Sequence, residues 1–243
     1  MTAPSSSSAA EFAALTCSAP EERAARMAEL VLRHAPAGPI RILDLGCGIG
    51  GLLFRLASAL PEATCVGIDV SVANIAVAEA TRRVSPERDR LAFELVDYLE
   101  WKTPPMVLIA TDSVLNLIGG DTDSLVAKIA NDLRPGGSIV ISMPYACARN
   151  TFIAWARHVL RASRTSWVDA AILAVGRLLH PEVTDGLLRE RVHYMYLPPT
   201  RVMGRRLEAA FSGHGLIPIA RYPVKSASIA QLRHSVTVWR KNS

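Results

Sequence analysis

The fold is decided by the stretch Arg41-Ile42-Leu43-Asp44-Leu45-Gly46-Cys47-Gly48-Ile49-Gly50-Gly51. Its first half continues an apolar run from residue 40 to residue 45, which predicts a short buried strand. Its second half is rich in glycine and predicts a tight turn, followed by a helix over about 51–60 that Pro61 ends. A buried strand, a glycine turn and a helix in this order are typical of the first unit of a parallel α/β sheet.

Strands and helices continue to alternate along the chain. Ser71 is predicted to cap a helix over 72–84, and Asp121 or Thr122 to cap one that ends near residue 133. A capping box at 18–21 predicts an earlier helix that runs to about His34. Further strands are predicted at 64–68, 91–96, 106–110 and, after a turn at 134–137, at 138–142.

The pattern changes after Pro144. Residues 148–190 read as helical, with breaks near 163–164 and 180–181. Thr200 is a candidate cap for another helix, which ends near 213–215, and two late strands follow at 216–222 and 235–239. We therefore predict a disordered tail over 1–17 and one domain over 18–243, with a helical cap insertion over about 148–195.

Composition excludes several classes of protein. The chain of 243 residues can bury a sizeable core, and its four cysteines are scattered without a C-x-x-C pair, so we expect neither a disulfide framework nor a metal site. The first ten residues lack the features of a secretory signal, and no apolar run is long enough to cross a bilayer. A cytoplasmic location is the simplest expectation.

Charge is distributed unevenly along the chain. Residues 1–148 hold 12 basic and 17 acidic residues, whereas residues 149–243 hold 15 basic and 5 acidic residues. A basic C-terminal part is compatible with an anionic substrate, a membrane surface, nucleic acid or simply a solvated surface.

The glycine turn alone leaves two ligands open. Gly46, Gly48 and Gly51 satisfy G-x-G-x-x-G, and Asp69 follows at the spacing of a ribose-binding acid, so a dinucleotide-binding oxidoreductase is one reading. However, Asp44 at the end of the first strand would repel a pyrophosphate. The same carboxylate would attract a cationic ligand by about 4 kcal/mol at roughly 4 Å and a dielectric near 20, before desolvation.

Five segments with these motifs resemble the class I S-adenosylmethionine (SAM)-dependent methyltransferases. They are residues 42–50, 67–71, 96–98, 111–115 and 133–137. The resemblance implies a doubly wound, seven-stranded, mostly parallel Rossmann-like sheet whose last strand is reversed. It also implies SAM as cofactor, with S-adenosylhomocysteine as product and no metal.

The resemblance further implies a cofactor site. Asp69 would hold the ribose hydroxyls, Asp97 would contact the adenine amino group and Tyr98 would pack on the ring. The full expected set is Asp44, Gly46, Cys47, Gly48, Gly50, Asp69, Val70, Asp97, Tyr98, Asp112 and Ser113.

The acceptor should approach over the ends of the fourth and fifth strands. Candidate catalytic residues are His193 as a base, Tyr194 as a hydrogen-bond donor and Asp112, although methyl transfer can proceed by positioning alone. Candidate substrate contacts are Asn116, Tyr145, Trp155, Tyr194 and Tyr196. Each aromatic residue could instead pack in the core, and the insertion could be a substrate lid or a purely structural element.

We therefore predict methyl transfer to a small, partly hydrophobic or aromatic acceptor of the specialised-metabolite type. The Asn/Asp-Pro-Pro-aromatic motif is absent and aromatic residues are scarce, which argues against nucleic-acid bases. RNA or a lipid headgroup and a NAD(P)-dependent oxidoreductase remain alternatives. The apolar helices of the insertion could also form a homodimer.

Overall fold

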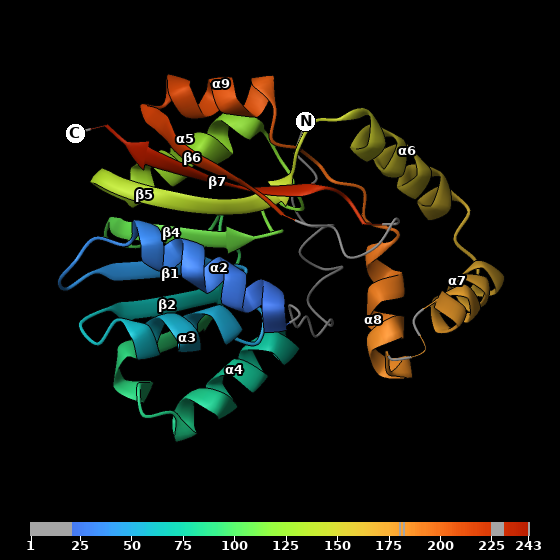
Figure 1. Cartoon of the computed structure of the whole chain (residues 1–243), viewed down its shortest axis with the longest axis horizontal. Coiled ribbons are helices and arrows are strands. Elements are labelled where there is room, and N and C mark those ends of the chain that lie inside the picture. The colour runs from blue at the N-terminus through green and yellow to red at the C-terminus, as the bar shows by residue number, and fades with distance from the viewer. Residues whose placement is uncertain (1–20, 180, 182, 225–230, 243) are drawn as a thin grey trace.

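The computed structural model describes residues 21–179, 181, 183–224 and 231–242. A seven-stranded sheet forms its centre, in the order β3-β2-β1-β4-β5-β7-β6 (Figure 1). Only β7 runs antiparallel to its neighbours β5 and β6. The strands are β1 (Arg41–Leu45), β2 (Thr64–Asp69), β3 (Leu91–Leu95), β4 (Met106–Asp112), β5 (Leu133–Pro144), β6 (Leu216–Pro223) and β7 (His234–Lys241).

Helices cover both faces of the sheet (Figure 1). They are α2 (Glu21–His34), α3 (Gly51–Ala59), α4 (Val72–Val84), α5 (Thr122–Asp132) and α9 (Arg205–Gly213), together with α6 (Ala148–Ala162), α7 (Ser166–Leu179) and α8 (Asp185–Tyr194) in the insertion. A short 3-10 turn, η1 (Arg88–Arg90), precedes β3.

Successive residues of β1 enter two different cores. Ile42 packs with residues of α2 and α3, whereas Leu43 and Leu45 pack with residues of α5 and α9 on the opposite face. Both faces of the central strands are thus covered by helices, which is why these strands read as continuous apolar runs in the sequence.

The expected doubly wound sheet is confirmed, and two helix caps lie where the sequence places them. The Ser71 hydroxyl accepts the Asn74 amide at 3.2 Å, and the Asp121 carboxylate accepts the Ser124 amide at 2.7 Å. Each side chain satisfies a backbone donor that the first turn of the helix leaves unpaired.

Two expectations turn out differently. Thr200 does not cap α9, because its hydroxyl donates to the carbonyls of Asn116 and Ile118, and the residue before α9 is Gly204. β5 begins at Leu133, five residues earlier than expected, since Leu133 already pairs with Met106. The expected tail over 1–17 and the capping box at 18–20 lie outside the described residues.

The insertion stands at the carboxyl ends of the parallel strands. The β4 arrow points toward α6, α7 and α8, and α6 and α7 lie at the outer edge of the molecule (Figure 1). Within the described ranges, no helix combines the length and the apolar character needed to cross a membrane.

The turn after β1 requires glycine at residue 46. Gly46 has φ 74°, and a Cβ atom built there would lie 2.2 Å from a methyl group of Val114. The amides of Gly46 and Cys47 both donate to the Ile68 carbonyl, at 2.9 and 3.0 Å, so the turn is fixed against β2. The close approach of Val114 adds a packing constraint to the conformational one.

We expect Gly46→Ala to destabilise the fold more than Gly38→Ala. Both glycines have positive φ, but no atom lies within 4 Å of a Cβ built at Gly38. The left-handed conformation costs about 1–2 kcal/mol at either position, and overpacking against Val114 adds about 1–3 kcal/mol at residue 46. Urea unfolding measures both free energies. Val114→Ala should recover part of the Gly46→Ala loss, and equal losses at the two glycines would refute the packing argument.

Candidate functional site

Asp69, at the end of β2, is hydrogen-bonded to the glycine turn. Its carboxylate accepts the Gly48 amide at 2.9 Å and the Ser71 amide at 2.8 Å. One side chain therefore ties the turn after β1 to the start of α4. Because parallel strands end at the same edge of the sheet, this tie places Asp69 beside the glycine turn.

Asp44 is a buried acid at that edge. Its side chain lies at the end of β1 and the residue is only 3% exposed. Burial, and then the neighbouring carboxylates of Asp112 and Asp69, raise the pKa of Asp44 to about 8. Its carboxyl group is therefore mostly protonated at neutral pH in the absence of a ligand.

The same acids also affect the pKa of the Cys47 thiol. Burial, followed by the charges of Asp44 and Asp69, raises the pKa of the Cys47 thiol well above its usual range. The thiol therefore stays protonated at neutral pH. Among the residues that the structure describes, no group of three His, Cys, Asp or Glu side chains is arranged to hold a metal ion.

These three acids, Asp44, Asp69 and Asp112, give the site its electrostatic character. A cationic group placed among them would lower the pKa of Asp44 and gain attraction, whereas the negative charge of a pyrophosphate would raise that pKa further and gain no attraction from the carboxyl groups. The geometry thus favours a cationic ligand at the glycine turn.

A second cluster lies next to this one, and we call it the Arg23 group. It consists of Arg23, Asp112, Ser113, Ser142 and His234. The Arg23 guanidinium donates to both carboxylate oxygens of Asp112, at 2.7 and 2.5 Å, and to the hydroxyl of Ser113. It also lies 3.4 Å from the Ser142 hydroxyl and 3.4 Å from Nδ1 of His234. The N-terminal turn of α2 is thereby fixed to the ends of β4 and β5.

Ser113 and His234 complete this group. Ser113 has φ 62°, a left-handed conformation that is unusual for a serine, and its hydroxyl lies 3.2 Å from Nδ1 of His234. Burial, and then the charges of Arg23 and Arg157, lower the pKa of His234 to about 4 despite the opposing effect of Asp112. The imidazole is therefore neutral at physiological pH and can exchange hydrogen bonds but is a weak base.

Arg157 faces the same region from α6. It donates to the Leu197 carbonyl at 3.1 Å, and its Nε is buried without a hydrogen-bond partner. Desolvation lowers the pKa of Arg157, and no described carboxylate contributes to that shift. Since its charge also lowers the pKa of His234, the guanidinium lies near the Arg23 group.

The expected adenine contacts lie in two environments. Asp97 accepts the Leu99 amide at 2.9 Å near the surface. Tyr98 is buried in the core, with Lys128 4.7 Å from the centre of its ring. Val70 is half-buried beside Asp69. Asp97 remains available to a ligand at this edge, whereas one face of the Tyr98 ring is already covered.

The expected acceptor contacts are spread more widely. Asn116 and Tyr196 are buried, and each has a side-chain oxygen without a hydrogen-bond partner. Tyr145 and His193 are half-buried. Trp155 is 60% exposed on α6. Tyr194 ends α8, and its side chain lies outside the described residues.

Sequence reasoning missed Arg23, His234 and Arg157. Arg23 and His234 lie 89 and 121 residues away from the residues that they contact, Asp112 and Ser113. The spacing of residues within a single helix or strand therefore could not predict these two contacts. Arg157 lies in the stretch 148–190, whose pattern predicts only helices.

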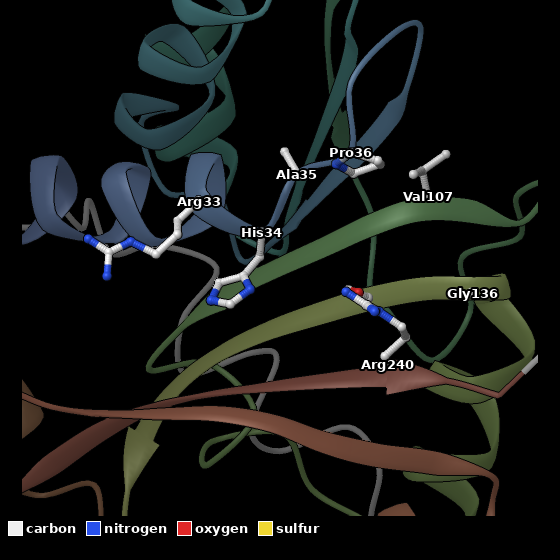
Figure 2. A pocket seen from close by; sticks show the side chains of 8 residues that line it. Arg33, His34, Ala35, Pro36, Val107, Gly136 and Arg240 are labelled. Atoms are coloured by element: carbon white, nitrogen blue, oxygen red, sulfur yellow. The ribbon is translucent and has the colours of Figure 1, made fainter.

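A separate cavity of about 500 Å³ opens at the opposite edge of the sheet. The His34 ring lies between Arg33 and Arg240 there (Figure 2). Burial, and then these two arginines, lower the pKa of His34. Although this cavity is large, it lies at the amino ends of β4 and β5, away from the glycine turn, whereas ligands of such sheets bind at the carboxyl ends.

Sequence comparison identifies relatives of the chain. A family model described as a methyltransferase domain matches residues 38–184. A trans-aconitate 2-methyltransferase from Methylobacterium radiotolerans is 32% identical over 177 residues, which cover 69% of this chain and 63% of that protein. One from Methylobacterium nodulans is 35% identical over 125 residues, which cover 51% and 46%. The chain thus matches less than two thirds of the length of these relatives.

Solved structures share the fold at low identity. The N-methyltransferase NodS from Bradyrhizobium japonicum, solved with S-adenosylhomocysteine, gives a TM-score of 0.57 at 18% identity, covering 91% of this chain and 87% of that chain. The [4+2]-cyclase SpnF gives 0.61 at 15% identity, covering 91% and 80%. Since one of these proteins is named a cyclase, the shared fold alone does not define the reaction.

We expect Asp44→Asn to stabilise the ligand-free protein increasingly as pH rises from 6.5 to 8. The folded state keeps the Asp44 proton up to about pH 8, whereas the unfolded state loses it near its ordinary pKa, so deprotonation favours unfolding. The parent should lose at most about 1.4 kcal/mol per pH unit relative to the variant in this range.

The range avoids an opposing contribution from His234. Because its folded pKa is lowered to about 4, His234 makes stability rise with pH between about 4 and its unfolded value of 6.5. Urea unfolding at several pH values measures the difference. Asp89→Asn, at a carboxylate whose side chain is 90% exposed, is the matched control. An Asp44→Asn effect that did not change with pH would contradict the raised pKa.

Proposed function

This chain belongs to the methyltransferase-domain family of class I SAM-dependent enzymes, and we propose on that premise that it methylates a small-molecule acceptor. The observation that carries the proposal is the buried Asp44 carboxyl beside Asp69 and Asp112. It supports a cationic ligand at the glycine turn, and it argues against the phosphate-bearing cofactor of a NAD(P)-dependent oxidoreductase.

The residues present fit SAM. The positive φ angles of Gly46 and Gly48 allow the sharp turn between β1 and α3, and the Asp44 carboxyl would face the ammonium end of the ligand. Asp69 would hold the ribose hydroxyls, and Asp97 would accept from the adenine amino group. When bound, SAM supplies an electrophilic methyl carbon on a sulfonium leaving group.

The acceptor that these residues suit is one already ionised at neutral pH. A hydroxyl acceptor would need a base, and two groups at the strand ends do not suit that role, because His234 has a pKa of about 4 and Asp112 is paired with Arg23. A carboxylate acceptor needs no base, because it is deprotonated before it binds. The chain would then act by positioning the acceptor and excluding water.

Arg157 supports the same class of acceptor. It is a desolvated cation on the face of α6 that is turned toward the protein, flanked by the half-buried Ile153 and Leu160. A molecule with one anionic group and an apolar part would complement both features. The relatives are named trans-aconitate 2-methyltransferases, and trans-aconitate is a small carboxylate. We therefore propose a small, partly hydrophobic carboxylate as the acceptor.

Calorimetry tests the cofactor. We expect SAM and S-adenosylhomocysteine to bind, NAD not to bind, and SAM binding at pH 7 to release up to one proton as Asp44 ionises. Titrations in two buffers with different ionisation enthalpies measure the released proton. Asp44→Asn should abolish the release and weaken binding, whereas Asp89→Asn should change neither. Binding of NAD without either SAM or its product would refute the proposed function.

An acceptor panel tests the substrate. We expect labelled methyl groups from SAM to reach small carboxylates, with trans-aconitate in the panel, in preference to their neutral amides. Loss of a charged hydrogen bond in Arg157→Gln should raise KM about 10- to 100-fold with a smaller change in kcat. Arg161→Gln removes the same charge from the same helix and is the control. Equal turnover of acids and amides would show that the acceptor charge is not recognised.

A further inference from the structure

The cavity at the amino ends of β4 and β5 is distant from the residues that the proposed function uses. Its volume of about 500 Å³ lies in the range of pockets that hold a small molecule. Helix α2 runs between the two regions, since Arg23 near its start belongs to the Arg23 group and His34 at its end lines the cavity. The two residues are about 17 Å apart along the helix axis. A small ligand in the cavity would therefore not contact the Arg23 group.

Three basic side chains surround this cavity. Arg33 and His34 come from the last turn of α2, and Arg240 comes from β7 (Figure 2). None of the described residues that line the cavity is an acid. Burial, and then the charges of Arg33 and Arg240, lower the pKa of His34, and no described carboxylate opposes this effect. The electrostatic potential in the cavity is therefore positive.

The end of α2 explains only part of this positive charge. A helix carries a partial negative charge at its carboxyl end, which Arg33 can offset. Arg33 also shares the Glu29 carboxylate with Arg26, at 3.0 and 2.5 Å. Arg240 belongs to another element, and its exposed guanidinium makes no hydrogen bond or ion pair with the part of the chain that the structure describes. One cation at the cavity is thus left without a partner there.

Ser138 places a second donor next to Arg240. The two residues are directly paired between β5 and β7, and they share the face of the sheet on which Val140 and Val238 pack with α2. Ser138 lines the cavity and is only 5% exposed, yet its hydroxyl has no hydrogen-bond partner within the described ranges. Since buried hydroxyl groups are normally hydrogen-bonded, this pair of donors suits a ligand with acceptor oxygens.

We propose that this cavity is a second ligand site, which binds a small molecule through a phosphate group. A phosphate monoester carries close to two negative charges at neutral pH and has three acceptor oxygens, so it can accept from Arg240 and Ser138 together. A carboxylate has one charge and complements the basic cavity less well. Ala35, Pro36 and Val107 line the same cavity and suit an apolar part of the molecule.

Calorimetry of the full chain with phenyl phosphate tests this proposal. We expect phenyl phosphate to bind at low salt and to bind more weakly as salt is raised. Inorganic phosphate, which lacks the apolar part, and benzoate, which has a single negative charge, should both bind more weakly than phenyl phosphate. Saturation with S-adenosylhomocysteine should leave the affinity for phenyl phosphate unchanged, because the cavity and the glycine turn lie at opposite edges of the sheet.

Matched variants locate the bound phosphate. Arg240→Gln should weaken phenyl phosphate binding about 10- to 100-fold, since it removes a charged hydrogen bond, and Ser138→Ala should weaken it about 2- to 10-fold. Arg83→Gln removes the same charge from an exposed position of α4 and should change the affinity little. Urea unfolding verifies that each variant is folded.

Four results would overturn the proposal. They are no binding of phenyl phosphate, equal binding of inorganic phosphate, equal effects of Arg240→Gln and Arg83→Gln, and competition between phenyl phosphate and S-adenosylhomocysteine. The last result would place the phosphate at the glycine turn. Because phenyl phosphate is also titrated without S-adenosylhomocysteine, its binding is measured independently of the proposed methyl transfer.

Discussion

The carboxyl group of Asp44 is buried at the end of β1, and no described cation lies close enough to lower its pKa. A buried acid without a partner is costly when ionised, so this carboxyl group stays protonated. In the neutral form it makes no ion pair. The guanidinium of Arg23, which lies next to these acids, is paired with Asp112. A charge interaction at Asp44 is thereby left to a cationic ligand.

Features of the sequence that act over a few residues were predicted well. The apolar run before Gly46 identified the first strand, and Ser71 and Asp121 identified the starts of α4 and α5, because each cap bonds an amide three residues along the chain. Thr200 shows the limit of such local predictions. A threonine before a helical pattern is a common helix cap, but here its hydroxyl donates to carbonyls of a loop more than eighty residues away.

The acid side of the site could be predicted because its members follow successive strands, and strands of a parallel sheet end at one edge. The basic side could not. Arg23 comes from a helix before the first strand, His234 from the reversed strand and Arg157 from the insertion, so no shared spacing connects them. Their meeting depends on tertiary packing, and only the structure distinguishes these residues from the other basic residues of the chain.

The position of β7 has a consequence for biosynthesis. Because β7 runs opposite to β5 and lies between β5 and β6, its first residue, His234, reaches the edge of the sheet where the parallel strands end. Both β6 and β7 follow every other strand in the chain. During translation the strands β1 to β5 can pair while the chain is still attached to the ribosome. The Arg23 group, which contains His234, forms only after β7 has emerged, so a nascent chain has its glycine turn well before this group is complete.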